Sequence, residues 1–363
     1  MPVGTTGAAW LRLTLIPGIG GETQRKLLAA FGLPEAIFSA SRSNLRSIIG
    51  DKATDRLLET DNRAAVAAAQ QWAEQPGQRI LTLADEDYPR ALFDIADPPT
   101  LLYVRGRCEL LSLPALAIVG SRNATPQGES NARAFAAALA AEGLSIVSGL
   151  ALGIDAAAHR GAIAAGGATI AVIGTGADRL YPARNHALAG EIAEKGAIVS
   201  EFPLGTPAAA SNFPRRNRLI SGLSRGVLVV EAAVESGSLI TARMAGEQGR
   251  EVFAIPGSIH SPQARGCHRL IRQGAKLVET AQDVMEELGT AIEAASIATC
   301  TTEAGGEESL RILALAGFDP VTMDDLVTRS GLTAEALSVI LLQLELDRRV
   351  SCLPGGRYQR LAE

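Results

Sequence analysis

Between residues 114 and 288, short apolar runs alternate with longer segments whose apolar residues recur at helical spacing. Gly, Pro or Ser bounds the apolar runs, which is typical of strands buried on both faces of a parallel sheet. Alternating strands and helices predict an α/β domain, here a Rossmann-like parallel sheet covered by helices on both faces. The expected strands are Leu116–Val119, Ser145–Val147, Thr169–Ile173, Ala197–Val199, Val227–Val230 and Val252–Ile255. The expected helices are Gln127–Glu142, Ile154–Ala165, Asn185–Lys195, Arg216–Ser224 and Ser238–Gln248.

Residues 1–75 are expected to form a separate helical module ahead of this core, which takes residues 76–288. In the stretch Pro17–Gly21, glycines flank Ile19, and the amphipathic run Thr23–Phe31 follows. A glycine turn ahead of a helix resembles the helix-hairpin-helix module, which presents backbone N–H groups to phosphate. An ordinary packed pair of helices explains the same pattern, because any such pair needs a turn with Gly or Pro.

A third module is expected at residues 309–363, after an acidic linker at 289–308. Residues 279–308 contain eight carboxylates and no Lys or Arg, which is typical of a solvated segment. Beyond it, three helical patterns precede two short strands around Gly355–Gly356, and this order predicts a winged-helix-like module. Its recognition helix, Thr333–Asp347, carries three acidic residues, so a structural or protein-contact role is favoured over DNA sequence reading. The helical patterns are Leu310–Leu315, Met323–Ser330 and Ala334–Asp347.

Composition limits the compartment and the kind of partner. The formal net charge is −5, so an affinity for nucleic acid would have to come from a local basic patch. The four cysteines are scattered without a C-x-x-C pair, which suits a reducing compartment and predicts neither a zinc site nor disulfides. No secretory leader or apolar stretch of membrane-spanning length is present, so a cytoplasmic location without membrane association is expected.

The usual nucleotide and catalytic motifs are missing. The first expected strand is followed by Gly120-Ser121-Arg122, with one glycine where the dinucleotide fingerprint needs three, and no P-loop occurs. The nucleophile elbow and the zinc-protease helix motif are also absent, so we expect neither cofactor nor metal, and a binding protein rather than an enzyme. His159 is interpreted as a packing residue.

Basic residues and glycines gather where the expected strands end, which is where open α/β sheets bind ligands. Residues 211–226 carry four arginines and no acidic residue, and the guanidinium group suits phosphate oxygens. Arg122 directly follows a strand, and Ser236-Gly237-Ser238 opens a helix as a candidate anion cradle. Alternatively, these arginines form an internal network with acidic residues. The arginines of the run are Arg215, Arg216, Arg218 and Arg225, and the acidic candidates are Asp155, Asp178, Glu201 and Glu231.

Taken in order, the polar and glycine-rich blocks of residues 85–288 resemble the DprA/Smf family. They include Gly120-Ser121-Arg122, Ser148-Gly149-Leu150, Gly153-Ile154-Asp155, Tyr181-Pro182, Phe213-Pro214, Ser236-Gly237-Ser238 and Pro256-Gly257. The resemblance implies a protein that binds and protects incoming single-stranded DNA during natural transformation and helps to load the recombinase RecA. It also implies a homodimer formed through the Rossmann-like core, for which Leu270 and Ile271 are the candidate interface residues.

The candidate DNA-binding residues combine the motif blocks with the basic run. Arg184 is included because the lysine that the family often has after Tyr-Pro is Ala183 here, with Arg184 next. Phe213 and Tyr181 are the candidates for base stacking. The full set is Gly120, Ser121, Arg122, Ser148, Gly149, Arg184, Asn185, Phe213, Arg215, Arg216, Asn217, Arg218, Ser236, Gly237 and Ser238.

Two other functions fit a Rossmann-like core. A nucleoside-monophosphate phosphoribohydrolase of the lysine-decarboxylase-like family would need a catalytic Glu three residues after a motif threonine. If Thr241 is matched to that threonine, the position holds Met244. A winged-helix regulator that senses a small ligand through the core would need a basic recognition helix, which this sequence lacks.

Overall fold

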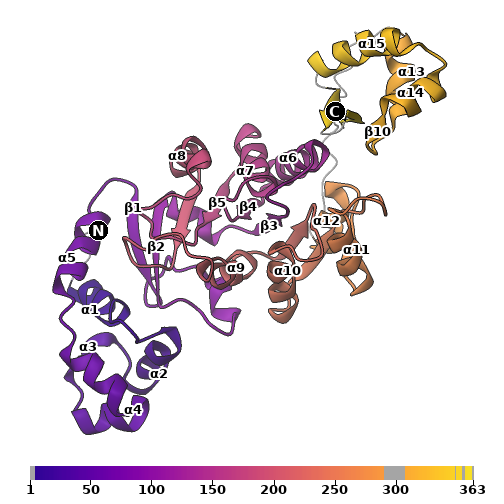
Figure 1. The fold of residues 1–363 in the computed structure, drawn as a ribbon. Helices are drawn as coiled ribbons and strands as arrows, with labels where there is room; N and C mark the ends of the chain where they lie inside the picture. The colour runs from indigo at the N-terminus through magenta and orange to yellow at the C-terminus, as the bar shows by residue number, and fades with distance from the viewer. Residues whose placement is uncertain (1–4, 290–306, 348, 354–355, 362–363) are drawn as a thin grey trace.

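A computed structural model describes residues 5–289, 307–347, 349–353 and 356–361. In this part of the chain, a nine-stranded sheet with the order β1-β2-β6-β5-β4-β3-β7-β8-β9 forms the centre of the core (Figure 1). The strands from β6 to β9 in this order are parallel, while β2 pairs antiparallel with β6 and β1 with β2. The strands are β1 (Gln78–Thr82), β2 (Leu101–Gly106), β3 (Ala115–Val119), β4 (Ser145–Ser148), β5 (Thr169–Val172), β6 (Ala197–Ser200), β7 (Gly226–Val229), β8 (Glu251–Ala254) and β9 (Lys276–Leu277). The predicted α/β fold class is confirmed.

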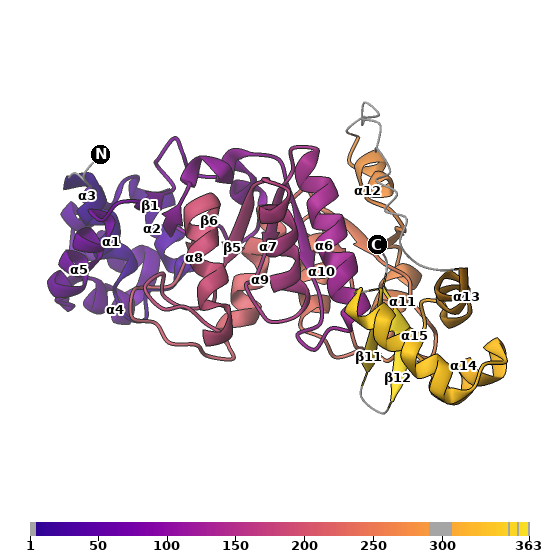
Figure 2. The same ribbon diagram turned by 90° about the horizontal axis from the view of Figure 1, so that it is seen from above.

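Helices cover both faces of the sheet, as Figures 1 and 2 show. Alternate side chains of β3 pack into two separate apolar layers, one on each face of the sheet, since successive side chains of a strand point to opposite faces. Leu116 and Ile118 pack with α6 and α7, whereas Val119 packs with Leu219 and Ile220 of α9. One face carries α6 (Pro126–Ala141), α7 (Ile154–Ala164) and α8 (His186–Lys195), and the other α9 (Asn212–Gly222), α10 (Ser238–Glu247) and α11 (Arg265–Arg272). A further helix, α12 (Ala281–Glu287), packs against α6.

The core differs from the sequence prediction at α9 and in three strands that were not expected, β1, β2 and the short edge strand β9. Helix α9 begins at Asn212, not at Arg216, because Pro214 falls in its first turn, where proline is compatible with a helix. Strands β1 and β2 were not predicted, since no helix separates them and their alternation is short. The two strands extend the sheet past β6 at the edge that faces the N-terminal module.

The N-terminal module consists of helices, as predicted, and packs on that edge. Its own core contains Leu13, Leu27 and Leu57, each fully buried. At the edge, the rings of Trp72 and Tyr103 meet edge to face with centroids 5.6 Å apart. The helices are α1 (Thr5–Thr14), α2 (Gly21–Phe31), α3 (Pro34–Ser39), α4 (Arg42–Glu59) and α5 (Arg63–Ala73).

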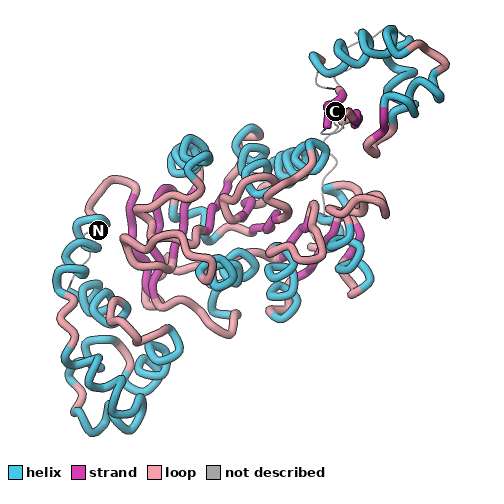
Figure 3. The backbone as a smooth tube through the Cα atoms, in the orientation of Figure 1, coloured by secondary structure: helices cyan, strands magenta, loops and turns pink. Residues whose placement is uncertain are grey.

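The C-terminal module has the predicted winged-helix composition of helices and a small sheet, visible in Figure 3. Its core is built from Leu313, Leu326, Leu341 and Val350. The elements are α13 (Glu307–Ala316), β10 (Val321–Thr322), α14 (Met323–Ser330), α15 (Ala334–Leu346), β11 (Val350–Leu353) and β12 (Arg357–Arg360). Most of the predicted linker, residues 290–306, lies outside the described residues. Across the described ranges, no helix is long and apolar enough to cross a bilayer.

Candidate nucleic-acid interface

A cleft of about 790 Å³ opens at the carboxyl ends of β3, β4 and β7. The sheet order places β3 between β4 and β7, so the chain turns in opposite directions on the two sides of this point. Open α/β sheets bind their ligands at such a switch point, outside the carboxyl ends of the strands. We call it the α9 cleft, and its lining includes Gly120, Ser121, Arg122, Asp155, Tyr181, Phe213, Arg216, Asn217, Ser236, Gly237 and Ser238.

The loop after β3 is held by backbone contacts that leave Arg122 outside. The N–H group of Ser121 donates to the carbonyl of Glu231, and the Ser121 carbonyl accepts from Ile154. A Cβ atom on Gly120 would lie 2.6 Å from Cγ1 of Ile154, so only glycine fits this close approach. Ser121 is buried, whereas Arg122 is exposed and makes no ion pair within the described part of the chain.

Aromatic rings stand beside this arginine at the rim of the cleft. The Arg122 guanidinium carbon lies 5.3 Å from the centroid of the Phe213 ring. The rings of Phe213 and Tyr181 are 5.9 Å apart and tilted by 37°, and Tyr181 is half exposed. A cation and accessible aromatic faces in one place suit a nucleotide, whose phosphate is anionic and whose base can stack.

Arg216, in contrast, is buried beneath the cleft with 4% exposure. It donates to the carbonyls of Gly149, at 2.7 Å, and Val172. Burial lowers its pKa to about 10 despite the nearby charge of Asp155. Asp155 accepts hydrogen bonds from the N–H groups of Gly149 and Ala151, and burial raises its pKa against the pull of Arg216. Through these two bonds of its Nη1 group Arg216 props the loop after β4, and the same side chain forms part of the cleft lining.

Two other predicted contact residues also lie behind the cleft. The Ser148 hydroxyl donates to the Ile118 carbonyl at 2.6 Å, and Asn185 donates to the Leu150 carbonyl at 2.9 Å. Both side chains are buried, and Leu150 takes a positive φ of 58° that these contacts help to hold. Arg184 is exposed but does not line the cleft. Ser148 and Asn185 therefore hold the loop that forms one wall of the cleft, whereas Arg184 lies outside the cleft.

The turn that opens α10 is less open than the sequence suggested. The hydroxyls of Ser236 and Ser238 bond each other at 2.7 Å, and the Ser238 N–H group donates to the Ser236 hydroxyl. The next two N–H groups, of Leu239 and Ile240, donate to carbonyls of the same turn. Asn217 ties α9 to this turn through the Gly237 carbonyl. The predicted anion cradle thus has most of its donors already engaged.

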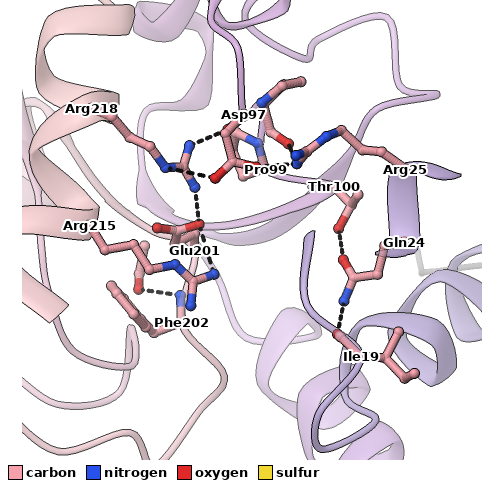
Figure 4. Close-up of polar contacts among 12 residues, drawn as sticks. Ile19, Gln24, Arg25, Asp97, Pro99, Thr100, Glu201, Phe202, Arg215 and Arg218 are labelled. Carbon is pink, nitrogen blue, oxygen red and sulfur yellow. Dashed lines mark hydrogen bonds and ion pairs between the residues drawn. The ribbon is translucent and has the colours of Figure 1, made fainter. Parts of the chain in front are cut away.

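On the other side of α9, Arg218 and Arg215 face acidic residues (Figure 4). Glu201 receives one Arg218 N–H group, and Arg215 approaches the same carboxylate oxygen at 3.4 Å. Asp97 pairs with both Arg218 and Arg25, which links the core to α2. Arg218 is therefore part of an internal network, the alternative that the sequence had left open, while Arg215 stays about half exposed.

Further residues singled out in the sequence have structural surroundings. Leu270 is 8% exposed and belongs to the apolar core, whereas Ile271 is only partly buried. His159 is fully buried, bonds Thr169 through Nδ1, and has its pKa lowered to about 3 by burial and by Arg216, as expected of a packing residue. No cluster of potential metal ligands occurs among the residues that the structure describes.

Residues 79–289 match the model of DNA recombination-mediator protein A, and residues 298–356 match the DprA winged helix domain. Protein Smf from Escherichia coli is 38% identical over 97% of this chain and 95% of its own length. DNA processing protein DprA from Streptococcus pneumoniae is 49% identical over 57% of this chain and 73% of its own.

Solved structures agree with the sequence relatives. The X-ray structure of DprA from Streptococcus pneumoniae matches with a TM-score of 0.69 and 38% identity, covering 79% of this chain and 99% of that one. DprA from Helicobacter pylori, solved in a study of its single-stranded DNA binding mode, matches with a TM-score of 0.53 and 33% identity, covering 58% and 95%. With a family model spanning more than half of its 363 residues and a full-length relative, the chain belongs to the DNA recombination-mediator protein A family, the DprA/Smf family that its motifs resemble.

Proposed function

We propose that the chain binds single-stranded DNA in the α9 cleft. The observation that carries this proposal is the exposed Arg122, without an acidic partner, beside the rings of Phe213 and Tyr181. Proteins that bind single strands without reading sequence combine basic groups along the backbone with rings on which bases stack. The likeness to the Helicobacter pylori protein, whose structure concerns single-stranded DNA binding, supports the same function.

The candidate residues then divide into two groups with different tasks. Those on the accessible wall would touch the strand, and those buried behind it would hold the wall in shape. The proposed contact residues that line the cleft are Gly120, Ser121, Arg122, Phe213, Asn217, Ser236, Gly237 and Ser238. Arg215, exposed on the other side of α9, and Arg184, at the periphery, complete the proposed set. The proposed supporting residues are Ser148, Gly149, Asn185, Arg216 and Arg218.

Binding is tested by fluorescence anisotropy with single-stranded and duplex oligonucleotides of equal length. We expect a preference for the single strand, and a slope of log affinity against log salt of about −0.7 for each phosphate contact. Arg122→Ala should weaken binding roughly tenfold and reduce the slope by about one contact. The matched control is Arg160→Ala, an exposed arginine of α7 on the opposite face of the sheet. Equal loss in both variants, or none in Arg122→Ala, would contradict the site.

The wider role follows from the family. We propose that the chain acts in the cytoplasm during natural transformation, where it protects incoming strands and helps to load RecA. Support comes from relatives called DNA processing protein DprA. The measurement is RecA ATP hydrolysis on single strands coated with single-strand-binding protein, with and without this chain. If the chain did not accelerate RecA ATP hydrolysis, the proposed loading of RecA would be wrong and only the proposed protection of the strand would remain.

Self-association through the core is a further proposal, centred on α11. Because Leu270 packs inward, Ile271 is the better residue to change. Ile271→Arg should lower the sedimentation coefficient of a homodimer to that of a monomer, while unchanged sedimentation of a folded variant would place the interface elsewhere.

We propose binding without catalysis. Thr241, which would match the hydrolase motif, is buried in α10, and Met244 occupies the position of the catalytic carboxylate. Incubation with nucleoside monophosphates should release no free base. Release that disappears in Glu231→Gln would favour the phosphoribohydrolase instead.

A further inference from the structure

A second cavity, of about 470 Å³, lies between the N-terminal module and the core. We call it the side pocket. It is large enough for a nucleobase with its sugar, and the turn Gly18–Gly21 forms part of its wall. Gln24 fixes this turn by donating to the Ile19 carbonyl, and Thr100 of the core donates to Gln24 (Figure 4). The two parts of the chain thus build one wall together.

Three buried polar atoms of residues that line the side pocket have no hydrogen-bond partner. The Glu201 side chain is 4% exposed, and only its Oε2 atom is used, by Arg218 and Arg215. Its Oε1 atom is buried and unpartnered, as are the hydroxyl of Tyr103 and the Nε atom of Arg218, which lies 3.4 Å from Asp97 without a hydrogen bond. Buried polar groups are nearly always paired, and an unpaired acceptor and hydroxyl in a cavity wall indicate a ligand that supplies donors.

The charges around the pocket limit the ligand further. Arg25, Arg215 and Arg218 contribute three positive charges, and Asp97 and Glu201 contribute two negative ones, which leaves one positive charge. Three arginines disfavour a metal cation at Glu201. A nucleotide unit matches the pattern, because its phosphate is anionic while an amino group on its base is a hydrogen-bond donor.

The side pocket and the α9 cleft lie on opposite sides of one helix. Phe213, Arg216 and Asn217 line the cleft, whereas Arg215 and Arg218 line the side pocket. A helix with its side chains is about 10–12 Å thick, so a strand that enters both cavities has to pass around α9. Arg215 is about half exposed and could contact a phosphate of a strand that runs from the α9 cleft to the side pocket.

We propose that the side pocket is a base-reading subsite of the bound strand, in which Oε1 of Glu201 accepts a hydrogen bond from the exocyclic amino group of a nucleobase. This inference rests on the proposed binding of single-stranded DNA. Cytosine, adenine and guanine carry such an amino group. Thymine does not: its single ring N–H lies between two carbonyl oxygens that would face the carboxylate. A strand without amino groups therefore binds through the α9 cleft but leaves the subsite unused.

The test compares twelve-residue oligo-dC and oligo-dT by fluorescence anisotropy on the full chain. The native protein should bind oligo-dC about tenfold more tightly, the effect of one hydrogen bond to a charged group. Glu201→Gln and Tyr103→Phe should each reduce this ratio toward one. Tyr103→Phe should leave the affinity for oligo-dT unchanged, whereas Glu201→Gln also frees Arg215 from its carboxylate partner and should raise that affinity slightly. Tyr103→Phe removes only an unpartnered hydroxyl, so it keeps the test valid if Glu201→Gln loosens the N-terminal module.

The control is Arg122→Ala, which should weaken both oligonucleotides equally and keep their ratio. Equal affinities in the native protein, or a preference that survives in both pocket variants, would overturn the subsite. If deoxycytidine monophosphate bound as tightly as the oligonucleotide, the subsite proposal would also be overturned, because the pocket would then be a mononucleotide site. Failure of the proposed function is distinct, because neither oligonucleotide would bind.

Discussion

The two sides of α9 carry arginines that are neighbours in the sequence but differ in their surroundings. On the cleft side, Arg216 is buried under the loop after β4 and donates to backbone carbonyls. On the other side, Arg218 pairs with carboxylates at the junction with the N-terminal module. The comparison teaches that a basic run does not by itself form a phosphate track. The exposed charges, at Arg122 and Arg215 with Arg184 at the periphery, are the ones that we propose for DNA.

The largest expected difference between the sides is in stability. Arg216→Ala removes the positive charge near the buried Asp155 and the two hydrogen bonds to the Gly149 and Val172 carbonyls, so the free energy of unfolding should fall by about 3–5 kcal/mol. Urea unfolding followed by circular dichroism measures this loss, with Arg160→Ala as the unaffected control. A folded variant of native stability that binds DNA poorly would instead make Arg216 a direct ligand.

On the other side, Arg218→Ala should cost less, about 2–3 kcal/mol. Arg218 is 11% exposed, and Arg215 remains to compensate Glu201. Limited proteolysis should also cut more quickly between the N-terminal module and the core, because Asp97 loses one of its two arginines. A cost equal to that of Arg216→Ala would break the distinction between the two sides.

Acid should act through His159, which is buried in α7 against Thr169 at the start of β5. Its pKa is lowered to about 3 in the folded chain, so its contribution is complete above the unfolded value of 6.5 and is lost as the pH falls toward 3. Between pH 7.5 and pH 5 this group should remove about 2 kcal/mol of unfolding free energy. Urea midpoints across this range provide the measurement, and His159→Gln should flatten the dependence. If the urea midpoint of His159→Gln fell as steeply with pH as that of the native chain, other groups would cause the loss of stability in acid.

The sequence predicted the cleft better than the roles of its residues. Glycines and polar residues after the strands at Val119, Ser148 and Val229 marked the correct edge, because parallel strands end together. The sequence analysis did not predict on which side of α9 each arginine lies. The signal was available: Arg215 and Arg218 are three residues apart, and Arg216 and Ile220 four, so each pair shares a helix face.

The sequence alone could not predict which polar side chains are buried. Ser148 and Asn185 resemble surface ligands in a motif, yet their partners are carbonyls that lie 30 and 35 residues away in the chain. The same holds for β2, whose place is set by pairing with β6, almost a hundred residues later, and for β1, which pairs with β2. Contacts over such separations depend on the assembled sheet.

The position of β3 between β4 and β7 has a consequence for synthesis. Most of the wall of the α9 cleft comes from residues 119–123, 151–155 and 233–241, with α9 inserted between the last two and with Tyr181, Ala208, Ala210 and Gln263 completing the lining. A ribosome-bound chain that ends before α10 has made most of the sheet but lacks one wall of the cleft. The proposed DNA site is therefore incomplete until about two thirds of the chain has been translated, and products truncated before α10 should not compete with finished molecules for strands.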